Sequence, residues 1–443
     1  MTTPTVAITT LRCKVNQYES AVMAEALSAR GYRMTAFRST ADVYIINTCT
    51  VTKKTDYQCR QLIRRAHKAN PAAQIIVTGC YAQIAPEALA RMPGVSLVLG
   101  NAEKQRIADY IEPAGGSSVP ARTITADAGS APCFNDPPLR SFANHTRAFL
   151  KIQDGCESFC SYCIVPYARG RIRSLPPDDV IKRLGALGES GFREVVLSCI
   201  HLGAYGIDLT PRASLLALLQ RIDSSSPVSR VRLSSLEPMD VSAELIACLA
   251  ASRTIFPHLH LPLQSGDDAI LALMNRPYRA ADFRELAAAL HASIPNLCLG
   301  TDLIAGFPGE TEAQFRSTCE MLESLPISHV HVFPYSRREK TAAADLPGQV
   351  PQQVIKARSA ALRSIGVRKR RAFYSAFIGK ELSVLVEGGA HGRPGQVRGW
   401  SSNYVPVVFE GPSGLRNQVV TVRADRIEGD AVRAVYRHVP LHA

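Results

Sequence analysis

Three cysteines lie close together in one short segment of the chain. Cys156, Cys160 and Cys163 occur in the stretch KIQDGCESFCSYCIVPYARG, which runs from residue 151 to residue 170. A [4Fe–4S] cluster that only carries electrons has four protein ligands, and no fourth cysteine follows nearby. Three ligands leave one iron open, and an open iron can bind a substrate. The spacing therefore favours such a cluster over its two alternatives, a zinc site, which usually needs four ligands, and a set of buried thiols.

A second set of cysteines lies in the first 110 residues. Apolar runs alternate there with helical patterns, which predicts a parallel sheet with strands at residues 6–11, 43–46, 74–78 and 96–99, and helices at 17–29, 56–69 and 86–92. Cys13, Cys49 and Cys80 each follow one of the first three strands within a few residues. Because the carboxyl ends of parallel strands meet at one edge, these cysteines should converge on a second metal cluster. Alone, each would more often be a small core residue.

The rest of the chain divides into three parts. Residues 111–144 are rich in proline, glycine and serine and are expected to form a linker. The region 145–371 predicts six β/α units, two short of a closed barrel, with strands at 148–152, 194–197, 230–234, 258–261, 297–303 and 329–333, separated by helices that include 178–189, 213–222 and 280–292. Residues 372–443 predict a small β-barrel from strands at 381–387, 404–409, 419–423 and 431–435. The fold class is therefore α/β, with a partial (β/α)6 barrel at its centre.

Charge and hydropathy indicate the partners of the protein. The chain of 443 residues has a formal net charge of +13, which favours a polyanionic partner, first of all nucleic acid. No apolar run approaches the ~18 residues of a membrane span, and the first residues lack the pattern of a secretory signal. We expect a cytoplasmic protein without a membrane partner, where clustered cysteines serve metal binding rather than disulfides.

Several motifs in the first two regions resemble those of the radical S-adenosylmethionine (SAM) methylthiotransferases. In the first region these are CKVNQYES at 13–20, NTCTVT at 47–52 and TGC at 78–80. The central region carries HLGAYG at 201–206, LSSLEP at 233–238, HLPLQSG at 260–266, DLIAGFPGE at 302–310, VHVFPYS at 330–336 and PGQ at 347–349. The likeness covers nearly the whole chain, and it implies a C-terminal TRAM domain that holds the substrate.

The resemblance also implies an activity. Within the family, the chain resembles the type that adds a methylthio group to C2 of N6-threonylcarbamoyladenosine at position 37 of tRNA, beside the anticodon. Two SAM molecules and two [4Fe–4S] clusters would be used. Cys156, Cys160 and Cys163 would hold the cluster that cleaves SAM, and Cys13, Cys49 and Cys80 an auxiliary cluster that carries the sulfur. A reductant such as flavodoxin or ferredoxin and a sulfur donor are the further implied partners.

Four residues are expected to contact SAM on the same grounds. Tyr162 would pack near its adenine, while Glu237, Gln264 and Asp302 offer polar groups at strand ends. Three positions depart from the family pattern and concern local geometry only. Arg12 and Lys340 stand where glycine is usual, and Ser198-Cys199 replaces a more usual Thr-Gly pair.

The C-terminal region should bind tRNA mainly through phosphates. Its arginines are interleaved with aromatic residues that could stack on bases, namely Trp400, Tyr404 and Phe409. The arginines are Arg393, Arg398, Arg416, Arg423, Arg426, Arg433 and Arg437. They argue against one alternative substrate, an aspartate of a ribosomal protein. Isopentenyl-adenosine tRNA remains open as a second, and a two-cluster electron carrier or an RNA-binding redox sensor is the non-enzymatic alternative.

Overall fold

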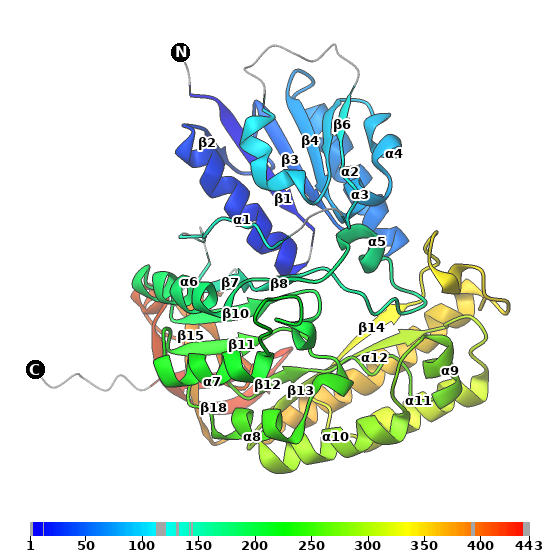
Figure 1. Ribbon diagram of the computed structural model, residues 1–443. Helices are drawn as coiled ribbons and strands as arrows, with labels where there is room; N and C mark the ends of the chain where they lie inside the picture. The colour runs from blue at the N-terminus through cyan, green and yellow to red at the C-terminus, as the bar shows by residue number, and fades with distance from the viewer. Residues whose placement is uncertain are drawn as a thin grey trace, which may run out of the picture.

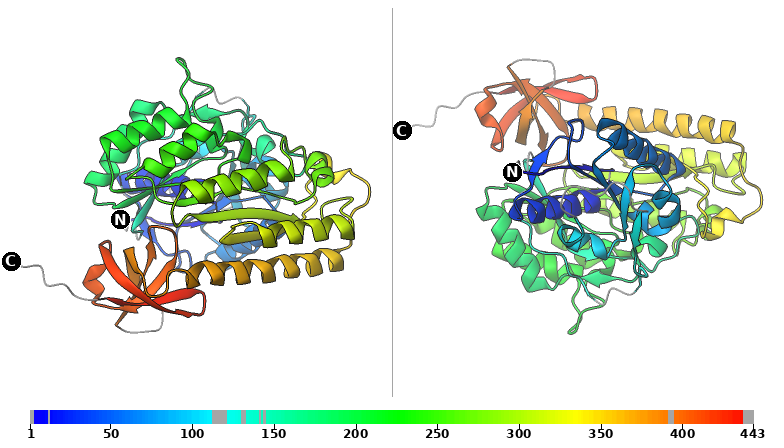
Figure 2. Two further views of the ribbon diagram at one scale, coloured as in Figure 1. Left: turned by 90° about the horizontal axis from the view of Figure 1, so that it is seen from below. Right: turned by 90° about the horizontal axis from the view of Figure 1, so that it is seen from above.

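The computed structural model describes residues 3–11, 13–111, 121–129, 133–140, 142, 145–390 and 395–436. An N-terminal α/β unit lies above a larger unit of parallel strands and helices (Figure 1). A small β unit, coloured orange to red, lies beside the larger one at the end of a long helix (Figure 2). Arg12, Arg393 and Arg437 lie outside the described residues.

The N-terminal unit is a six-stranded, all-parallel sheet in the order β2-β1-β3-β4-β5-β6. Its strands are β1 (Thr5–Thr10), β2 (Arg33–Thr35), β3 (Val43–Thr48), β4 (Gln74–Gly79), β5 (Val95–Leu99) and β6 (Arg122–Ile124). Its helices are α1 (Lys14–Ala29), α2 (Lys53–Ala69), α3 (Cys80–Ile84) and α4 (Pro86–Ala90). All six residues of β3 are buried, as expected for a central strand covered on both faces. The parallel sheet expected from the sequence is confirmed.

Part of the expected linker belongs to the folded units. Residues 122–124 form β6, which pairs with β5 at the edge of the sheet. Leu139 and Phe142 are buried in the apolar core of the central unit. Apolar side chains therefore fix this segment, although its proline and glycine content predicts a loose connection.

The central unit contains six parallel strands in sequence order, in two groups of three. The first group is β7 (Arg147–Lys151), β10 (Glu194–Ser198) and β11 (Arg230–Leu233), and the second is β12 (His258–His260), β13 (Cys298–Ala305) and β14 (His329–Pro334). A single parallel bridge from Val231 to Ile255 leads from the first group toward the second. Two-residue strands β8 (Gln153–Asp154) and β9 (Arg173–Ser174) pair with each other.

Helices cover the outer face of these strands (Figure 2). They are α6 (Pro177–Glu189), α7 (Leu215–Ser225), α8 (Ala243–Ala251), α9 (Asp268–Leu273), α10 (Ala280–Ser293), α11 (Glu312–Ser324) and α12 (Gln352–Ser375). The short helix α5 (Val165–Arg169) instead lies between the two units, in contact with α3 (Figure 1). Leucines from strands and helices form one apolar core, which Tyr18 and Val22 of α1 also join. The N-terminal unit is thus packed onto the central unit through α1. No described helix is long and apolar enough to cross a bilayer.

The C-terminal strands close into a five-stranded barrel in the order β15-β16-β17-β19-β18. They are β15 (Glu381–Gly389), β16 (Gln396–Ser401), β17 (Pro406–Glu410), β18 (Val419–Glu428) and β19 (Ala431–Tyr436). The sequence did not predict β16, because Gly399 weakens its strand pattern. A Cβ at Gly399 would lie 2.2 Å from the carbonyl oxygen of Leu385, so the glycine allows close approach of β15.

The boundary predicted at residue 371 falls inside α12, which continues to Ser375. The basic run 368–371 lies on this helix, where Arg368 pairs with Glu323 of α11 and Arg370 pairs with Asp430 between β18 and β19. One helix therefore joins the two units directly.

Two of the three aromatic residues expected to stack on RNA bases have partners within the protein, and the third is buried. Phe409 is 1 % exposed in the core of the small barrel. Trp400 and Tyr404 stack on each other with centroids 4.5 Å apart, and the Arg147 guanidinium of β7 lies over both rings. The prediction of base stacking is therefore wrong for the buried Phe409, and for the partly exposed Trp400 and Tyr404 it stays a prediction.

Candidate metal centres and the cavity beside them

Cys13, Cys49 and Cys80 follow three neighbouring strands of the N-terminal sheet. Cys13 is the residue before α1, Cys49 follows β3 directly, and Cys80 follows β4 as the first residue of α3. Because β1, β3 and β4 are adjacent and parallel, the three residues lie along the same edge. Cys80 is near enough to influence the pKa of both Cys13 and Cys49 electrostatically. The fold thus brings these cysteines together as the strand pattern predicts.

Gly79 allows the chain to turn from β4 into α3 at this edge. Its φ is +93°, and a Cβ there would lie 2.4 Å from the carbonyl oxygen of Thr48. Only glycine adopts this conformation at little cost. The Thr48 hydroxyl donates to the carbonyl of Thr78 at 2.6 Å and accepts from the amide of Tyr81 at 3.2 Å. These contacts hold Cys80 beside the end of β3.

The thiols of this edge fit a metal better than they fit free cysteines. Burial raises the pKa of Cys13, and it raises the pKa of Cys49 to about 12. A buried thiolate needs a positive partner, and a metal ion supplies one when it displaces the thiol proton. Three thiols with one shared edge are a donor set that suits an iron–sulfur cluster.

Cys156, Cys160 and Cys163 lie in the loop between β8 and α5. Gly155 begins this loop with φ +79°, and a Cβ there would lie 1.8 Å from the carbonyl oxygen of Arg171. The amide of Cys156 donates to Gly170 at 3.0 Å, and that of Cys163 donates to Cys160 at 2.9 Å. The loop is therefore folded back on itself, with its three thiols on one short turn.

The surroundings of these thiols differ from one to the next. Burial raises the pKa of Cys163 to about 12. Burial also raises the pKa of Cys156, but hydrogen bonds with His201 and Ser158 outweigh it and lower the pKa. Arg276 donates to the Cys160 Sγ at 3.3 Å and also pairs with Glu237. The loop thus combines half-buried thiols with a neighbouring guanidinium, which suits thiolate ligands of a metal.

A cavity of about 170 Å³ lies beside this loop. The central unit lines it with Tyr162, Cys163, Gln264 and Asp302, among others, and the N-terminal unit lines it with Val51 and Thr52. The two N-terminal residues come two and three positions after Cys49. One cavity therefore borders the loop cysteines and the segment that follows an N-terminal cysteine.

Three of the four residues expected at the SAM site line this cavity. They are Tyr162, Gln264 and Asp302. Gln264 has φ +65°, and its backbone N–H donates to the backbone carbonyl of Asp302 at 2.8 Å. Glu237 is not part of the lining, because its carboxylate pairs with Arg276 beside Cys160.

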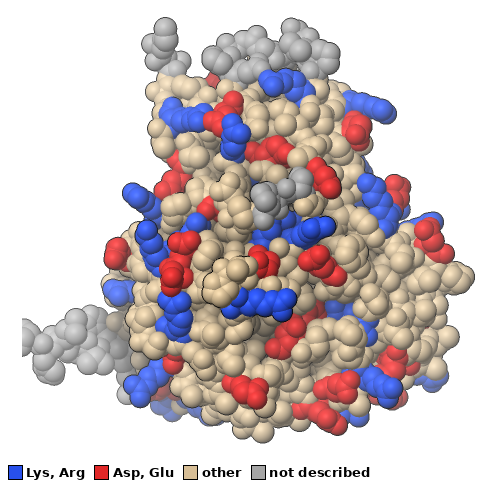
Figure 3. All heavy atoms as spheres, in the orientation of Figure 1, with Lys and Arg blue, Asp and Glu red and all other residues tan. Residues whose placement is uncertain are grey.

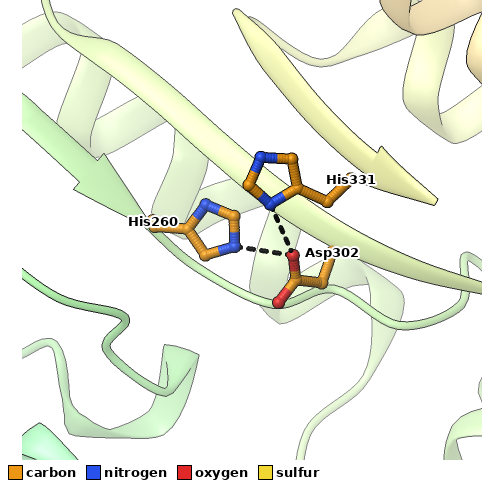
Figure 4. A group of neighbouring side chains, drawn as sticks. All are labelled: His260, Asp302 and His331. Carbon is orange, nitrogen blue, oxygen red and sulfur yellow. Dashed lines mark ion pairs between the residues drawn. The ribbon is translucent and has the colours of Figure 1, made fainter. Parts of the chain in front are cut away.

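Two histidines hold the side chain of Asp302 (Figure 4). His260 Nε2 lies 2.8 Å from Asp302 Oδ1, and His331 Nδ1 lies 3.3 Å from the same oxygen, so both rings are within ion-pair distance of the carboxylate. The two rings stack with centroids 5.1 Å apart. Although burial raises the pKa of Asp302, the histidines outweigh it and hold this pKa well below its usual range. The two histidine nitrogens and the Asp302 oxygen lie within 4.8 Å of one another, and the His331 side chain is 63 % exposed. The ion pairs hold the ionised Asp302 carboxylate in place beside the cavity.

A buried ionic cluster joins the two units near the cysteines. Glu19 of α1 pairs with Lys104, Lys151 and Arg169, and its side chain is 3 % exposed. Arg169 is the last residue of α5, and it also pairs with Asp154 at 3.1 Å. The carboxylates and the Cys80 thiolate raise the pKa of Arg169 against its burial. Because α5 follows the loop cysteines directly, this arginine links the two cysteine sets.

Sequence reasoning did not assign roles to His201, His260, Arg276, His331 and Arg169. His260 and His331 come from β12 and β14, the two neighbours of the strand that carries Asp302. Their place near the carboxyl ends of parallel strands is the signal that could have found them. Arg276 lies in the turn after α9, and its sequence has no comparable signal.

Two of the departures from the family pattern have a structural account. The Cys199 Sγ lies 3.1 Å from the Ser234 hydroxyl, and burial raises its pKa to about 12, so this thiol is held as a neutral group. Lys340 has φ +71°, a left-handed conformation that glycine adopts more easily.

Comparison with known proteins agrees with this arrangement. Residues 5–100 match the uncharacterized protein family UPF0004, and residues 150–322 match the radical SAM superfamily. The chain is 36% identical to the threonylcarbamoyladenosine tRNA methylthiotransferase MtaB of Bacillus subtilis, over 99% of this chain and 98% of that protein. It is 37% identical to the protein of the same name from Aquifex aeolicus, over 86% and 92%.

A related enzyme name also occurs among the similar proteins. The tRNA-2-methylthio-N(6)-dimethylallyladenosine synthase of Moorella thermoacetica is 35% identical over 96% of both chains. Among solved structures, the radical SAM methyltransferase TsrM from Kitasatospora setae matches with a TM-score of 0.58 and 14% identity, over 77% of each chain, which concerns the fold alone. The identities to the tRNA-modifying enzymes extend over nearly the whole chain, and the protein therefore belongs to the radical SAM methylthiotransferase family.

Proposed function

We propose that this protein adds a methylthio group to C2 of N6-threonylcarbamoyladenosine at position 37 of tRNA. The MtaB enzymes, which are named for this substrate, match nearly the whole chain. The observation that carries the proposal is the cavity bordered by Cys163 on one side and by Val51 and Thr52 on the other. A substrate base in this cavity would have the loop cysteines and the N-terminal cysteine edge on two sides.

Two [4Fe–4S] clusters fit the two cysteine sets. Cys156, Cys160 and Cys163 would hold one, and Cys13, Cys49 and Cys80 the other. When bound, the first supplies the electron that cleaves SAM and the second carries the sulfur to be inserted. A reductant such as flavodoxin or ferredoxin and a sulfur donor complete the proposed partners.

The residues around the cavity would bind and orient SAM. Tyr162 offers a half-buried aromatic face for the adenine, and Gln264 and Asp302 offer polar groups on the same wall. His260 and His331 keep Asp302 ionised, which suits a carboxylate that accepts hydrogen bonds from hydroxyl groups. Glu237 would act through Arg276, which it orients toward Cys160.

The small barrel is proposed to be a TRAM-type domain that binds tRNA, and the six parallel strands a partial (β/α)6 barrel. Exposed arginines on the small barrel support phosphate binding, and they are Arg398, Arg416, Arg423 and Arg426. Basic and acidic side chains are intermixed on the face of the molecule seen in Figure 3.

The proposed function is tested with purified protein reconstituted anaerobically with iron and sulfide. Reduced protein and SAM should convert tRNA bearing N6-threonylcarbamoyladenosine into its 2-methylthio derivative, measured by mass spectrometry of the nucleosides. The matched control is the same tRNA with isopentenyl-adenosine at position 37. Product only from the isopentenyl tRNA would transfer the proposal to that substrate, and 5′-deoxyadenosine without any modified nucleoside would refute both.

A further inference from the structure

A second pocket lies directly beside the cavity. It has a volume of about 350 Å³ and is lined by Lys53, Arg337, Glu339, Lys340, Ala344 and Asp345. The amide of Lys53 donates to the Ser336 hydroxyl at 3.0 Å. Thr52 and Ser336 line the first cavity, so the two loops that carry them form a wall common to both pockets.

The lining of this pocket has a net charge of +1, because it contains three basic and two acidic side chains. Arg337 pairs with Asp345 over 3.6 Å, and the side chains are 57% and 88% exposed, so the pair is weak. Within the described part of the chain, the ammonium groups of Lys53 and Lys340 have no ion-pair partner. The pocket can therefore accept one further carboxylate.

The loop that carries these cations is firmly anchored. Arg338 points inward, where it donates to Asp56 Oδ2 at 2.6 Å and to the Thr50 hydroxyl. Lys340, two residues later, has φ +71°. This left-handed conformation is unfavourable for a lysine, and the protein nevertheless carries one here. A cation at this place is a specific feature of the sequence, held in position by a buried arginine next to it.

We propose that Lys53, Arg337 and Lys340 bind the carboxylate of the threonyl group of the substrate base. This inference rests on the proposed function. In adenine, C6, which carries the N6 substituent, is separated from C2 by N1 alone, so a base with C2 toward the cysteines can direct this substituent into the neighbouring pocket. An isopentenyl group carries no charge, and the pocket would therefore select between the two kinds of tRNA.

The test compares binding of anticodon stem-loop RNAs that differ only at position 37. One RNA carries N6-threonylcarbamoyladenosine, the second carries the amide of its carboxylate, and the third carries adenosine. The variants are Lys53→Gln with Lys340→Gln, the same pair with Arg337→Gln, and Lys182→Gln as a matched control, because Lys182 is an exposed lysine on α6. The wild-type protein should prefer the first RNA over the second by on the order of tenfold, the sum of a few partly exposed charge contacts.

The triple variant should lose this preference, whereas Lys182→Gln should keep it. Glu339→Gln should increase it, because a competing carboxylate is removed. Equal weakening of all three RNAs would assign the cations to phosphate contacts and overturn the proposal, and so would an unchanged preference. If the wild-type protein forms no methylthio product from threonylcarbamoyl tRNA, it is the proposed function that fails.

Discussion

The two cysteine sets are built in opposite ways. Cys156, Cys160 and Cys163 share one short loop, which a glycine begins and which backbone hydrogen bonds hold in place. Cys13, Cys49 and Cys80 are separated by more than thirty residues each, and they meet because β1, β3 and β4 are neighbours in a parallel sheet. The first set depends on local backbone geometry, while the second depends on the whole sheet.

This difference has a physical consequence for how each set can fail. A change in the loop should affect chiefly its own thiols, since the three cysteines lie within eight residues of one another. A change in the sheet or in its contact with the central unit should misplace thiols that are distant in sequence. The predictions below test this difference in turn.

The largest effect is expected from removing single thiols. Cys49→Ala should abolish the methylthio product while reduced protein still converts SAM to 5′-deoxyadenosine, because the loop set is ligated independently. Cys160→Ala should abolish both. Iron analysis after reconstitution should give about four irons per chain for a protein that lacks all three loop cysteines. Full product from Cys49→Ala would mean that the N-terminal thiols are structural.

The next largest effect is expected from breaking the buried ion pairs of Glu19 between the N-terminal unit and the central unit. Glu19→Ala leaves Lys104, Lys151 and Arg169 buried without their shared carboxylate. Breaking a buried charge cluster in this way should cost about 3–5 kcal/mol of stability, measured by urea unfolding. Asp178→Ala, which breaks an exposed pair with Arg221, should cost less than about 1 kcal/mol. Similar losses for both variants would contradict the role of Glu19.

A smaller effect is expected from replacing Gly79, the glycine at the turn from β4 to Cys80. Gly79→Ala forces a Cβ to within 2.4 Å of the Thr48 carbonyl at φ +93°, so it should cost roughly 2–4 kcal/mol. Iron bound by the N-terminal set should fall while cleavage of SAM persists. The control is Gly185→Ala in α6, where a Cβ meets nothing within 4 Å and should stabilise the helix by about 0.5–1 kcal/mol.

The smallest effect is expected from His329, which lies at the end of the central unit away from both sets of cysteines. His329 begins β14, and burial lowers its pKa to about 4. The unfolded chain takes up this proton near pH 6.5, so unfolding should become easier as the pH falls from 7 toward 4. The loss between pH 7 and pH 5 should be about 2 kcal/mol. His329→Gln should flatten this part of the stability profile, and an unchanged profile would exclude His329 as its cause.

The sequence predicted the parts of the site that depend on short-range patterns. The loop cysteines are recognisable from spacing alone, and the N-terminal cysteines from their positions after apolar strands. Tyr162, Gln264 and Asp302 were expected from a family resemblance, and all three line the cavity. Their assignment as SAM contacts stays a prediction.

Other features follow only from tertiary structure. Glu19 and Arg169 are 150 residues apart, and no local pattern pairs them. Trp400 and Tyr404 read as exposed aromatics on a basic domain, but the guanidinium of Arg147 and their own stacking occupy them. Cys199 lies near the other thiols in space and yet bonds to Ser234. Each of these depends on which surfaces meet, and that information is spread over the whole chain.

Helix α12 fixes a length in this protein. Its 24 residues span about 36 Å, and it is bound at both ends of its course, to Glu310 through Arg358 and to Asp430 through Arg370. The length of this helix therefore contributes to the distance between the small barrel and the cavity. One inserted residue would lengthen it by about 1.5 Å and rotate everything beyond it by about 100°. If the small barrel holds tRNA as proposed, such an insertion would change which nucleotide of the bound RNA lies at the cavity.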